Sequence, residues 1–292
     1  MLSAADYKLH REGDWSFWSL DDFRDSAMRR SLIALVQCQP SAQHPQTLRF
    51  SWPLDSSGQS FFLKLFHQRR GLSKVKDIFR ISKARRFWQQ GLDLAAAGFA
   101  VPRTVAMAEQ RRAGMARRSL VVTEALSGLP LPLYLSGLDS RAHGRAGAKM
   151  KRQAIAQLAE LVRRFHALGF VHGDLIAPNL FVVERQPDDW AFFFMDNDRT
   201  RRYFPWLTVQ LRKRNLVQLN RLPLAHISLQ DRMRFLHGYL GVSKLAERDR
   251  QLARWLEART RIRRKECDGA DPKQNFRRLM RWVPSATEAK PR

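Results

Sequence analysis

The stretch FVHGDLIAPNLFVVERQPDDWAFFFMDNDR, residues 170–199, decides the fold of this chain. It holds two short apolar runs rich in Phe and Val, Leu180 to Val183 and Trp190 to Met195. The segment between them is polar and contains a proline, which predicts a turn. We therefore expect a β-hairpin, with Asn179 directly before its first strand and Asp196 directly after its second.

The ends of this hairpin should bring two oxygen-bearing side chains together. Residues that face each other across antiparallel strands have Cα atoms about 4.5 to 5.5 Å apart, so Asn179 and Asp196 would lie side by side. Mg²⁺ prefers oxygen ligands, takes one or two carboxylates from protein, and completes its shell with water and substrate phosphate. The pair therefore predicts a magnesium site, with the carboxylate of Asp174 nearby on the same loop.

The order of polar residues in this stretch is that of a kinase catalytic loop followed by its metal-binding hairpin. His172, Gly173 and Asp174 are followed after four residues by Asn179, then by the two strands and Asp196. Taken singly, each Asp or Asn is explained by its common role in closing turns. The complete spacing, with strands on both sides, favours the kinase interpretation.

Length and charge set the outer limits of the function. A chain of 292 residues can bury a substantial core and suits one bilobal domain or two ordinary ones. The formal net charge of +25 creates a field that concentrates polyanions, so an acidic partner is expected. Nucleic acid, an anionic membrane and a phosphorylated glycolipid all meet that requirement.

The location is predicted from what the N-terminus and the apolar runs lack. MLSAADYKLHREGDW has no apolar core for a signal peptide, and no run approaches the roughly 18 apolar residues that span a bilayer. We expect a cytoplasmic protein. Cys38 and Cys267 are far apart and outside any CxxC pattern, which indicates reduced thiols and no structural zinc.

A second hairpin is predicted earlier in the chain, where TLRFSWPL and QSFFLKLF flank a turn at residues 55–58. Lys64 is the cation of its second strand, and a period of two places it on one face with Phe62 and Phe66. A lysine at a sheet edge can simply discourage aggregation. Because the catalytic hairpin is also predicted, we favour for Lys64 the role of the strand lysine that binds ATP phosphates.

The remaining elements follow from periodicity and end signals. VPRTVAMAE and RRSLVVTEAL predict a third hairpin, and the Pro- and Gly-containing segment from Ser127 to Pro132 predicts a linker. His166 and His172 are expected to brace the core or the loop, because no third metal-type residue has a suitable spacing. Helices are predicted from Ser19 to about Arg30, Val75 to Ala97, Lys149 to Leu168, Ser228 to Leu240 and Ser243 to about Lys265.

The last predicted helix has two interpretations. Its face with Leu252, Trp255, Leu256 and Ile262 would pack on the core and leave the arginines in solvent. The same helix would equally serve as a membrane or glycolipid contact surface.

From about Thr47 to Gly241 the sequence resembles the lipopolysaccharide core kinase family, which phosphorylates Kdo or heptose sugars of the inner core. The resemblance runs through TLRFSWPLDSSGQSFFLKLF, HGDLIAPN, MDNDR and SLQDRMRFLHGYLG. HGDxxxxN with a downstream aspartate is shared with aminoglycoside and choline kinases. The lysine strand, the DNDR sequence and the basic C-terminal helices narrow the resemblance to the lipopolysaccharide enzymes.

The resemblance implies an α+β, bilobal protein-kinase-like fold, with a β-rich N-lobe over residues 1–125 and a mainly helical C-lobe over residues 126–292. The implied cofactors are ATP and Mg²⁺. Asp174 would orient and deprotonate the acceptor hydroxyl, Lys64 would bind the α and β phosphates, and backbone groups near Glu124 and Leu126 would meet adenine. The implied metal ligands are Asn179 and Asp196, with Asp198 assisting the metal or the acceptor.

The sequence departs from the family at the helix after the lysine strand. Members usually carry a glutamate before the tryptophan of this helix, and here Phe87 precedes Trp88. Gly173 replaces the arginine that in many protein kinases meets a phosphorylated activation loop, so such regulation is not expected. A glycine-rich phosphate loop is also not evident.

We therefore expect a kinase that transfers phosphate from ATP to a heptose or Kdo hydroxyl of the lipopolysaccharide inner core, peripheral on the inner face of the inner membrane. An anionic membrane surface is the expected second partner, and nucleic acid is not. One alternative is a soluble aminoglycoside-type kinase, although that class usually offers an acidic pocket to a cationic substrate. The other is a pseudokinase that binds glycolipid, membrane or RNA, and Phe87 favours it.

Overall fold

The computed structural model describes residues 2–23, 25–38, 46–52, 59–67, 81–112, 115–138, 140–186, 188–221 and 227–268. The chain divides into two compact units. Unit 1 comprises Met1–Leu126 and the short segment Asp196–Arg199, and unit 2 comprises Ser127–Met195 and Thr200–Arg292. The chain therefore returns to unit 1 for four residues directly after the predicted catalytic hairpin.

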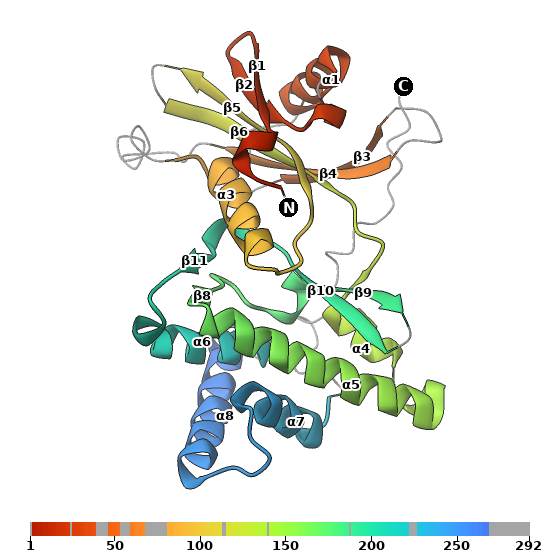
Figure 1. Cartoon of the computed structure of the whole chain (residues 1–292), viewed down its shortest axis with the longest axis vertical. Helices are drawn as coiled ribbons and strands as arrows, with labels where there is room; N and C mark the ends of the chain where they lie inside the picture. Colours follow the sequence, from red (N-terminus) through yellow and green to blue (C-terminus); the bar gives the residue numbers. More distant parts are fainter. Residues whose placement is uncertain are drawn as a thin grey trace. The chain divides into compact units, whose positions relative to one another are not determined.

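Within the described residues, unit 1 is built on one antiparallel sheet with the strand order β1-β2-β5-β6-β4-β3 (Figure 1). The predicted hairpins β3–β4 and β5–β6 are confirmed, and their turns lie outside the described residues. The sequence did not reveal the N-terminal hairpin β1–β2, which extends the sheet by pairing with β5. The strands are β1 (Lys8–Glu12), β2 (Trp15–Ser19), β3 (Gln46–Trp52), β4 (Gln59–His67), β5 (Thr104–Arg112) and β6 (Met115–Glu124).

Two α-helices accompany this sheet in the described part of unit 1, α1 (Ser26–Gln37) and α3 (Lys83–Ala96). The helix predicted from Ser19 begins instead at Ser26, because the carboxylate of Asp25 caps it by accepting from the Ala27 N–H at 2.8 Å. Residues 4–6, 21–23 and 197–199 form the short 3-10 helices η1 (Ala4–Asp6), η2 (Asp21–Phe23) and η4 (Asn197–Arg199).

Helix α3 starts later than the sequence indicated. Ser82 has extended backbone angles and its hydroxyl accepts from the Arg85 N–H at 3.0 Å, so a continuous helix from Val75 is wrong, and residues 75–80 lie outside the described part. Its predicted end is confirmed, since Gly98 follows the C-cap with φ of 78°. The helix packs on β4, β5 and β6 and against η4.

The core of unit 1 fills the space between the sheet and these helices. Alternate residues of β4, Phe61, Leu63 and Leu65, are buried, as the period of a strand requires. Helix α1 contributes one buried stripe with Met28 and Leu32. Burying such side chains stabilises a fold by roughly 1.5 to 3 kcal/mol each, so this core fixes the strand that carries Lys64. Its other large buried members include Trp15, Phe17, Val36, Trp88, Met107 and Leu120.

Unit 2 is mainly helical, and α5 is the longest helix of its described residues (Figure 1). The hairpin β9–β10 packs on one part of α5 and α7 on another. Its helices are α4 (Leu131–Gly137), α5 (Ser140–Ala167), α6 (Val209–Leu219), α7 (Leu229–Leu240) and α8 (Glu247–Asp268), with the 3-10 helices η3 (Ala177–Asn179) and η5 (Pro205–Thr208). Its strands are β7 (Leu129–Pro130), β8 (Phe170–Val171), β9 (Leu180–Gln186), β10 (Asp189–Phe194) and β11 (Arg201–Arg202).

The hairpin that decides the fold is confirmed, since β9 and β10 pair antiparallel with Leu180 opposite Phe194. The predicted linker is shorter than expected, because Leu129–Pro130 forms β7 beside β9 and the chain then enters α4. Helix α5 starts nine residues before Lys149, with a non-helical break at Gly144. It ends as predicted before Gly169, which has φ of 83°.

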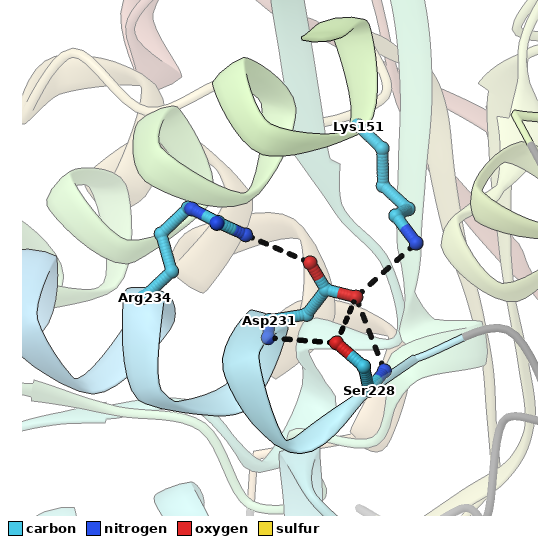
Figure 2. A network of polar contacts seen from close by, with 4 residues as sticks. All are labelled: Lys151, Ser228, Asp231 and Arg234. Carbon is cyan, nitrogen blue, oxygen red and sulfur yellow. Dashed lines mark hydrogen bonds and ion pairs between the residues drawn. The ribbon is translucent and has the colours of Figure 1, made fainter. Parts of the chain in front are cut away.

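The predicted capping box of α7 is confirmed. The Ser228 hydroxyl accepts from the Asp231 N–H at 3.1 Å, and the Asp231 carboxylate accepts from the Ser228 N–H at the same distance. Figure 2 shows Lys151 of α5 and Arg234 on the same carboxylate, at 3.1 and 2.8 Å. Burial raises the pKa of Asp231, but the hydrogen bonds from Ser228 and the ammonium of Lys151 outweigh it and hold the pKa below its usual value.

Helix α8 begins at Glu247 and not at Ser243, because Asp249 accepts from the Ala246 N–H and caps the helix there. Its predicted packing face is only partly correct. Trp255 and Ile262 remain 38% and 43% exposed, whereas Thr260 is fully buried and contacts Asn220 of α6. Part of the apolar face of α8 is therefore available to solvent.

Candidate active site

Lys64 projects from the centre of β4, on the face opposite the fully buried Leu63 and Leu65. Its ammonium lies 5.4 Å from the ring centroid of Phe66 and 5.7 Å from that of Phe87 in α3. The two rings confine the side chain, which is only 19% exposed, and they stabilise its charge through their negative faces. The two rings thus help to hold the lysine in one place.

The carboxylate that faces Lys64 belongs to Asp196. The two side chains form an ion pair through the Lys64 ammonium and Asp196 Oδ1. Asp196 has φ of 55°, in the left-handed region that Asp tolerates better than most residues. This turn carries the chain from the end of β10 into η4, which packs on α3.

Asp198 adds a second carboxylate to this cluster. Burial and the negative charge of Asp196 raise the pKa of Asp198, while the cations Lys64, Arg199 and Lys83 oppose the shift. Two neighbouring carboxylates beside a lysine form an oxygen-rich cluster in which a hard cation would relieve the repulsion between them. The donors present therefore fit Mg²⁺ in their chemistry.

In the part of the chain that the structure describes, no three His, Cys, Asp or Glu side chains are grouped to bind a metal. Mg²⁺ does not require such a cage, because it keeps waters and takes ligands from substrate phosphates.

The predicted catalytic loop lies in unit 2, between β8 and β9. The His172 ring donates from Nε2 to the Met195 carbonyl at 2.9 Å and accepts the Asp174 N–H at Nδ1 at 3.1 Å. Asn179 donates from its amide to the Asp174 carbonyl at 2.9 Å, and its own carbonyl accepts from the Met195 N–H at 2.9 Å. These bonds join Asp174 and Asn179 to the last residue of the hairpin before Asp196.

Two amides of α6 complete the loop, and reasoning from the sequence missed both. Asn215 is buried, donates to the His172 carbonyl at 2.7 Å and accepts its N–H at 3.0 Å. Gln218 accepts from the Leu175 N–H at 3.3 Å and donates to the Gly173 carbonyl at 3.3 Å. The signal available in the sequence was the pair of amides three residues apart that flank the apolar Leu216 and Val217.

His166 also braces this network, as expected. Its Nε2 donates to the Asn215 amide oxygen at 3.2 Å, and its Nδ1 accepts from the Tyr239 hydroxyl at 2.9 Å. Burial lowers the pKa of His166 to about 4, against the effect of the hydrogen bond to Asn215. The ring is therefore neutral at physiological pH, which suits a bracing residue that both donates and accepts.

The carboxylate of Asp174 makes few contacts within the described residues. Gln218 approaches one of its oxygens at 3.5 Å, which is long for a hydrogen bond, whereas the backbone of Asp174 is held firmly. The side chain is half-buried. A carboxylate on a rigid backbone with few internal partners is suited to bind a substrate group.

Glu124 and Leu126, near which backbone groups were predicted to contact adenine, lie at the end of the first segment of unit 1. Glu124 ends β6, where its N–H donates to the Arg103 carbonyl at 3.0 Å and its side chain pairs with the Arg103 guanidinium at 2.8 Å. The N–H of Glu124 is therefore engaged by the protein. Leu126 is half-buried and lies outside any strand.

The structure thus brings the predicted residues together in two groups. Lys64, Asp196 and Asp198 meet in unit 1, whereas Asp174 and Asn179 meet in unit 2.

An α+β fold with a paired strand lysine and an HGD loop before an Asn-hairpin-Asp sequence is that of the protein-kinase-like phosphotransferases. The chain belongs to the lipopolysaccharide kinase (Kdo/WaaP) family, whose model matches residues 43–239. It is a kinase of lipopolysaccharide core sugars that uses ATP. The recognition of the family, the fold class and the enzymatic function predicted from the sequence are confirmed.

A solved structure of WaaP in complex with acyl carrier protein has the same fold. It aligns with a TM-score of 0.57 and 21% identity, over 80% of this chain and 92% of that one. No curated protein matches this chain.

Unit 2 also contains an apolar cavity of about 590 Å³. Its walls come from α4, α5, α6, α7 and α8, and Asp231 is one of the residues that line it. Apolar walls of this extent are typical of a site for an apolar ligand. Its aliphatic lining includes Leu131, Leu135, Ile155, Leu158, Leu216 and Leu236.

No helix in the described ranges is long and apolar enough to cross a membrane.

Proposed function

We propose that this chain transfers the γ-phosphoryl group of ATP, bound with Mg²⁺, to a hydroxyl group of a Kdo or heptose sugar in the lipopolysaccharide inner core. The observation that supports the proposal most is the ion pair between Lys64 and Asp196, because it brings together the cation proposed to bind phosphate and the carboxylate proposed to bind the metal. In this proposal residues 1–125 act as the N-lobe and residues 126–292 as the C-lobe.

Lys64 would bind the α and β phosphates, and Asn179 and Asp196 would hold Mg²⁺ with help from Asp198. The donor set of carboxylate and amide oxygens supports this assignment. Bound Mg²⁺ would neutralise charge on the phosphates during transfer. Lys64 would then contact the phosphates and Asp196 the metal, so each member of the ion pair would have its own role in holding Mg·ATP.

Asp174 would orient the acceptor hydroxyl and take its proton. Its backbone is fixed by His172 and Asn179, while the carboxylate's one contact within the described residues is the long one with Gln218. Phosphoryl transfer requires positioning and electrostatic stabilisation more than covalent chemistry, so a rigid loop is the main contribution of unit 2. Backbone groups of Glu124 and Leu126 would meet adenine, with the carbonyl of Glu124 as acceptor since its N–H is engaged.

The test is phosphate transfer from ATP to dephosphorylated core lipopolysaccharide, with mass spectrometry to identify the modified sugar. We expect Asp174→Asn to lower kcat by about 10²-fold or more with little change in ATP binding, as for the loss of a general base. Phosphorylation of an aminoglycoside but not of the core would support the small-molecule kinase instead. Mg·ATP binding without transfer by wild-type protein would support the pseudokinase.

The apolar cavity favours a second partner. WaaP has been solved in complex with acyl carrier protein, and we propose that this chain also binds an acyl carrier protein, with the acyl chain entering the cavity beside Leu158 and Leu236. Binding of acylated but not of unacylated carrier protein in calorimetry would support this. Replacement of Leu158 by Gln should weaken that binding without changing affinity for Mg·ATP.

The charge of +25 supports a peripheral position at the anionic inner face of the inner membrane. Such binding should weaken as salt rises, since screening acts over only about 8 Å at physiological ionic strength.

A further inference from the structure

Residues Tyr203–Val209, called here the aromatic segment, expose a group of large apolar side chains. Trp206 is 70% exposed, Phe204 65% and Leu207 61%, and the rings of Phe204 and Trp206 stack with centroids 4.8 Å apart. Single exposed apolar residues need no explanation, but a contiguous group of aromatics usually marks an interaction surface. The segment does not contribute these side chains to any core of the described residues.

The aromatic segment is an ordered part of unit 2. The Tyr203 N–H donates to the Gly169 carbonyl at 2.9 Å, and Leu207 N–H donates to the Phe204 carbonyl at 3.0 Å within η5. Thr208 is fully buried and anchors the end of η5 to the start of α6. The exposed side chains are therefore presented by a backbone that is tied to the unit on both sides.

The sequence around the segment is free of negative charge. From Thr200 to Gln230 there is no Asp or Glu, while six residues are Lys or Arg. Such a composition beside exposed aromatic groups matches the interface of an anionic bilayer, where rings sit among headgroups and cations meet phosphates. The six cations are Arg201, Arg202, Arg212, Lys213, Arg214 and Arg221.

A hollow of about 400 Å³ between α6 and α8 continues this surface. It begins at Gln210, directly after the aromatic segment, and includes Arg214, Arg259 and Trp255. Arg214 and Arg259 are both exposed, and Lys213 lies 5.3 Å from the Trp255 ring centroid. Arg263 also lines the hollow and pairs with Glu266 at 3.1 Å. Guanidinium groups at an open hollow are suited to bind phosphate groups.

We propose that the aromatic segment inserts into the interfacial region of an anionic phospholipid bilayer, while Arg214 and Arg259 bind headgroup phosphates. The proposal rests on the proposed function in its choice of the inner membrane, and it assigns the peripheral contact to one surface. Charge alone would fit a nucleic acid as well. A bilayer differs from a nucleic acid in that it also offers an apolar medium to Phe204, Trp206 and Leu207.

The test uses flotation of the full chain with vesicles of phosphatidylethanolamine and anionic phosphatidylglycerol. We expect Trp206→Ser and Leu207→Ser each to lower the partition coefficient about tenfold or more, since each removes a large buried apolar side chain from the lipid-bound state. Leu9→Ser is the matched control, because Leu9 is 49% exposed on β1 of unit 1, and it should leave binding unchanged. Arg214→Gln with Arg259→Gln should weaken binding mainly at low salt.

Insertion is measured separately by quenching of tryptophan fluorescence with brominated lipid. The quenched component should disappear in Trp206→Phe, which keeps an apolar ring and should still float with the vesicles. Absence of vesicle binding by wild type, or equal loss in Leu9→Ser and Leu207→Ser, would overturn the proposal. The proposal would also be overturned if the protein did not bind vesicles and Trp206 were instead needed for a complex with nucleic acid or for a concentration-dependent dimer.

Failure of this inference is distinguishable from failure of the kinase assignment. Phosphate transfer to a water-soluble, deacylated core oligosaccharide does not require a membrane, so wild type, Trp206→Ser and Leu207→Ser should all show the same kcat on it. Vesicle binding without transfer would leave the membrane surface standing and remove the kinase assignment.

Discussion

The ammonium group of Lys64 pairs with the carboxylate of Asp196, 132 residues later in the chain. Phe87 stands where the resemblance led us to expect a glutamate, and its ring centroid lies 5.7 Å from the Lys64 ammonium. The lysine therefore has Asp196 as its anionic partner and Phe87 as an aromatic neighbour from α3. Both the hairpin end that carries Asp196 and helix α3 therefore contact the Lys64 side chain.

Asp196→Ala should abolish Mg²⁺-dependent binding of ATP, because it would remove the proposed metal ligand and the anion that pairs with Lys64. Asp189→Ala is the control, since Asp189 is an exposed carboxylate at the other end of the same hairpin. Titration calorimetry with ATP, with and without Mg²⁺, gives both affinities. Unchanged affinity in Asp196→Ala would remove this residue from the metal site.

Phe87→Leu should weaken Mg·ATP binding only about two- to fivefold. The substitution keeps an apolar side chain in a buried place and loses an interaction worth roughly 0.5 to 1 kcal/mol. Comparison of its Mg·ATP affinity with that of Asp196→Ala shows which neighbour positions Lys64. A loss as large as in Asp196→Ala would mean that the ring, and not the carboxylate, is the essential partner.

Stability should fall as the pH drops from 7.5 to 5, in part because of His166. Its pKa is about 4 in the folded protein and 6.5 for an unperturbed histidine, so the unfolded chain binds the extra proton between these values. The stabilisation is complete above pH 6.5 and is lost as the pH falls toward 4, by about 2 kcal/mol at pH 5. Urea unfolding of wild type and His166→Gln should show a smaller loss in the variant. Equal losses would mean that His166 does not carry the effect.

Asp231→Asn should destabilise the protein by about 3 kcal/mol, because it leaves the largely buried Lys151 without its anion and weakens the capping box. Glu160→Gln is the comparison, since it breaks an exposed pair with Arg163 that is worth at most about 1 kcal/mol. Denaturant midpoints of the two variants measure the difference. Similar midpoints would show that the network in Figure 2 contributes no more than a surface pair.

The sequence predicted those parts of the fold in which period and end signals agree. The hairpins β3–β4, β5–β6 and β9–β10 follow from alternating apolar runs, and the start of α7 follows from Ser228 and Asp231. The N-terminal hairpin β1–β2 was not predicted, since KLHRE carries almost no apolar pattern and is largely exposed. Its partner strand WSFWS could be assigned only from its pairing with β5 in the structure.

Residues of the candidate site could be predicted where they stand in a motif. Lys64, Asp174, Asn179 and Asp196 follow from spacing, and their chemical roles remain predictions. Asn215 and Gln218 could not be found from motif spacing. Their role depends on hydrogen bonds to buried backbone groups 43 residues away in the chain, and these contacts are known only from the fold.

The short ladder of β8 and β11 has a consequence for the choice of acceptor. Arg201 pairs with Val171 and Arg202 with Phe170, so the aromatic segment leaves one strand while the loop to Asp174 leaves the other. Paired strands do not slide without a change of register. With Trp206 at the lipid interface, Asp174 would stand at a constant height above the bilayer. The paired strands would then fix the distance between Asp174 and the bilayer. A sugar would be selected by its distance from the acyl chains as well as by its shape.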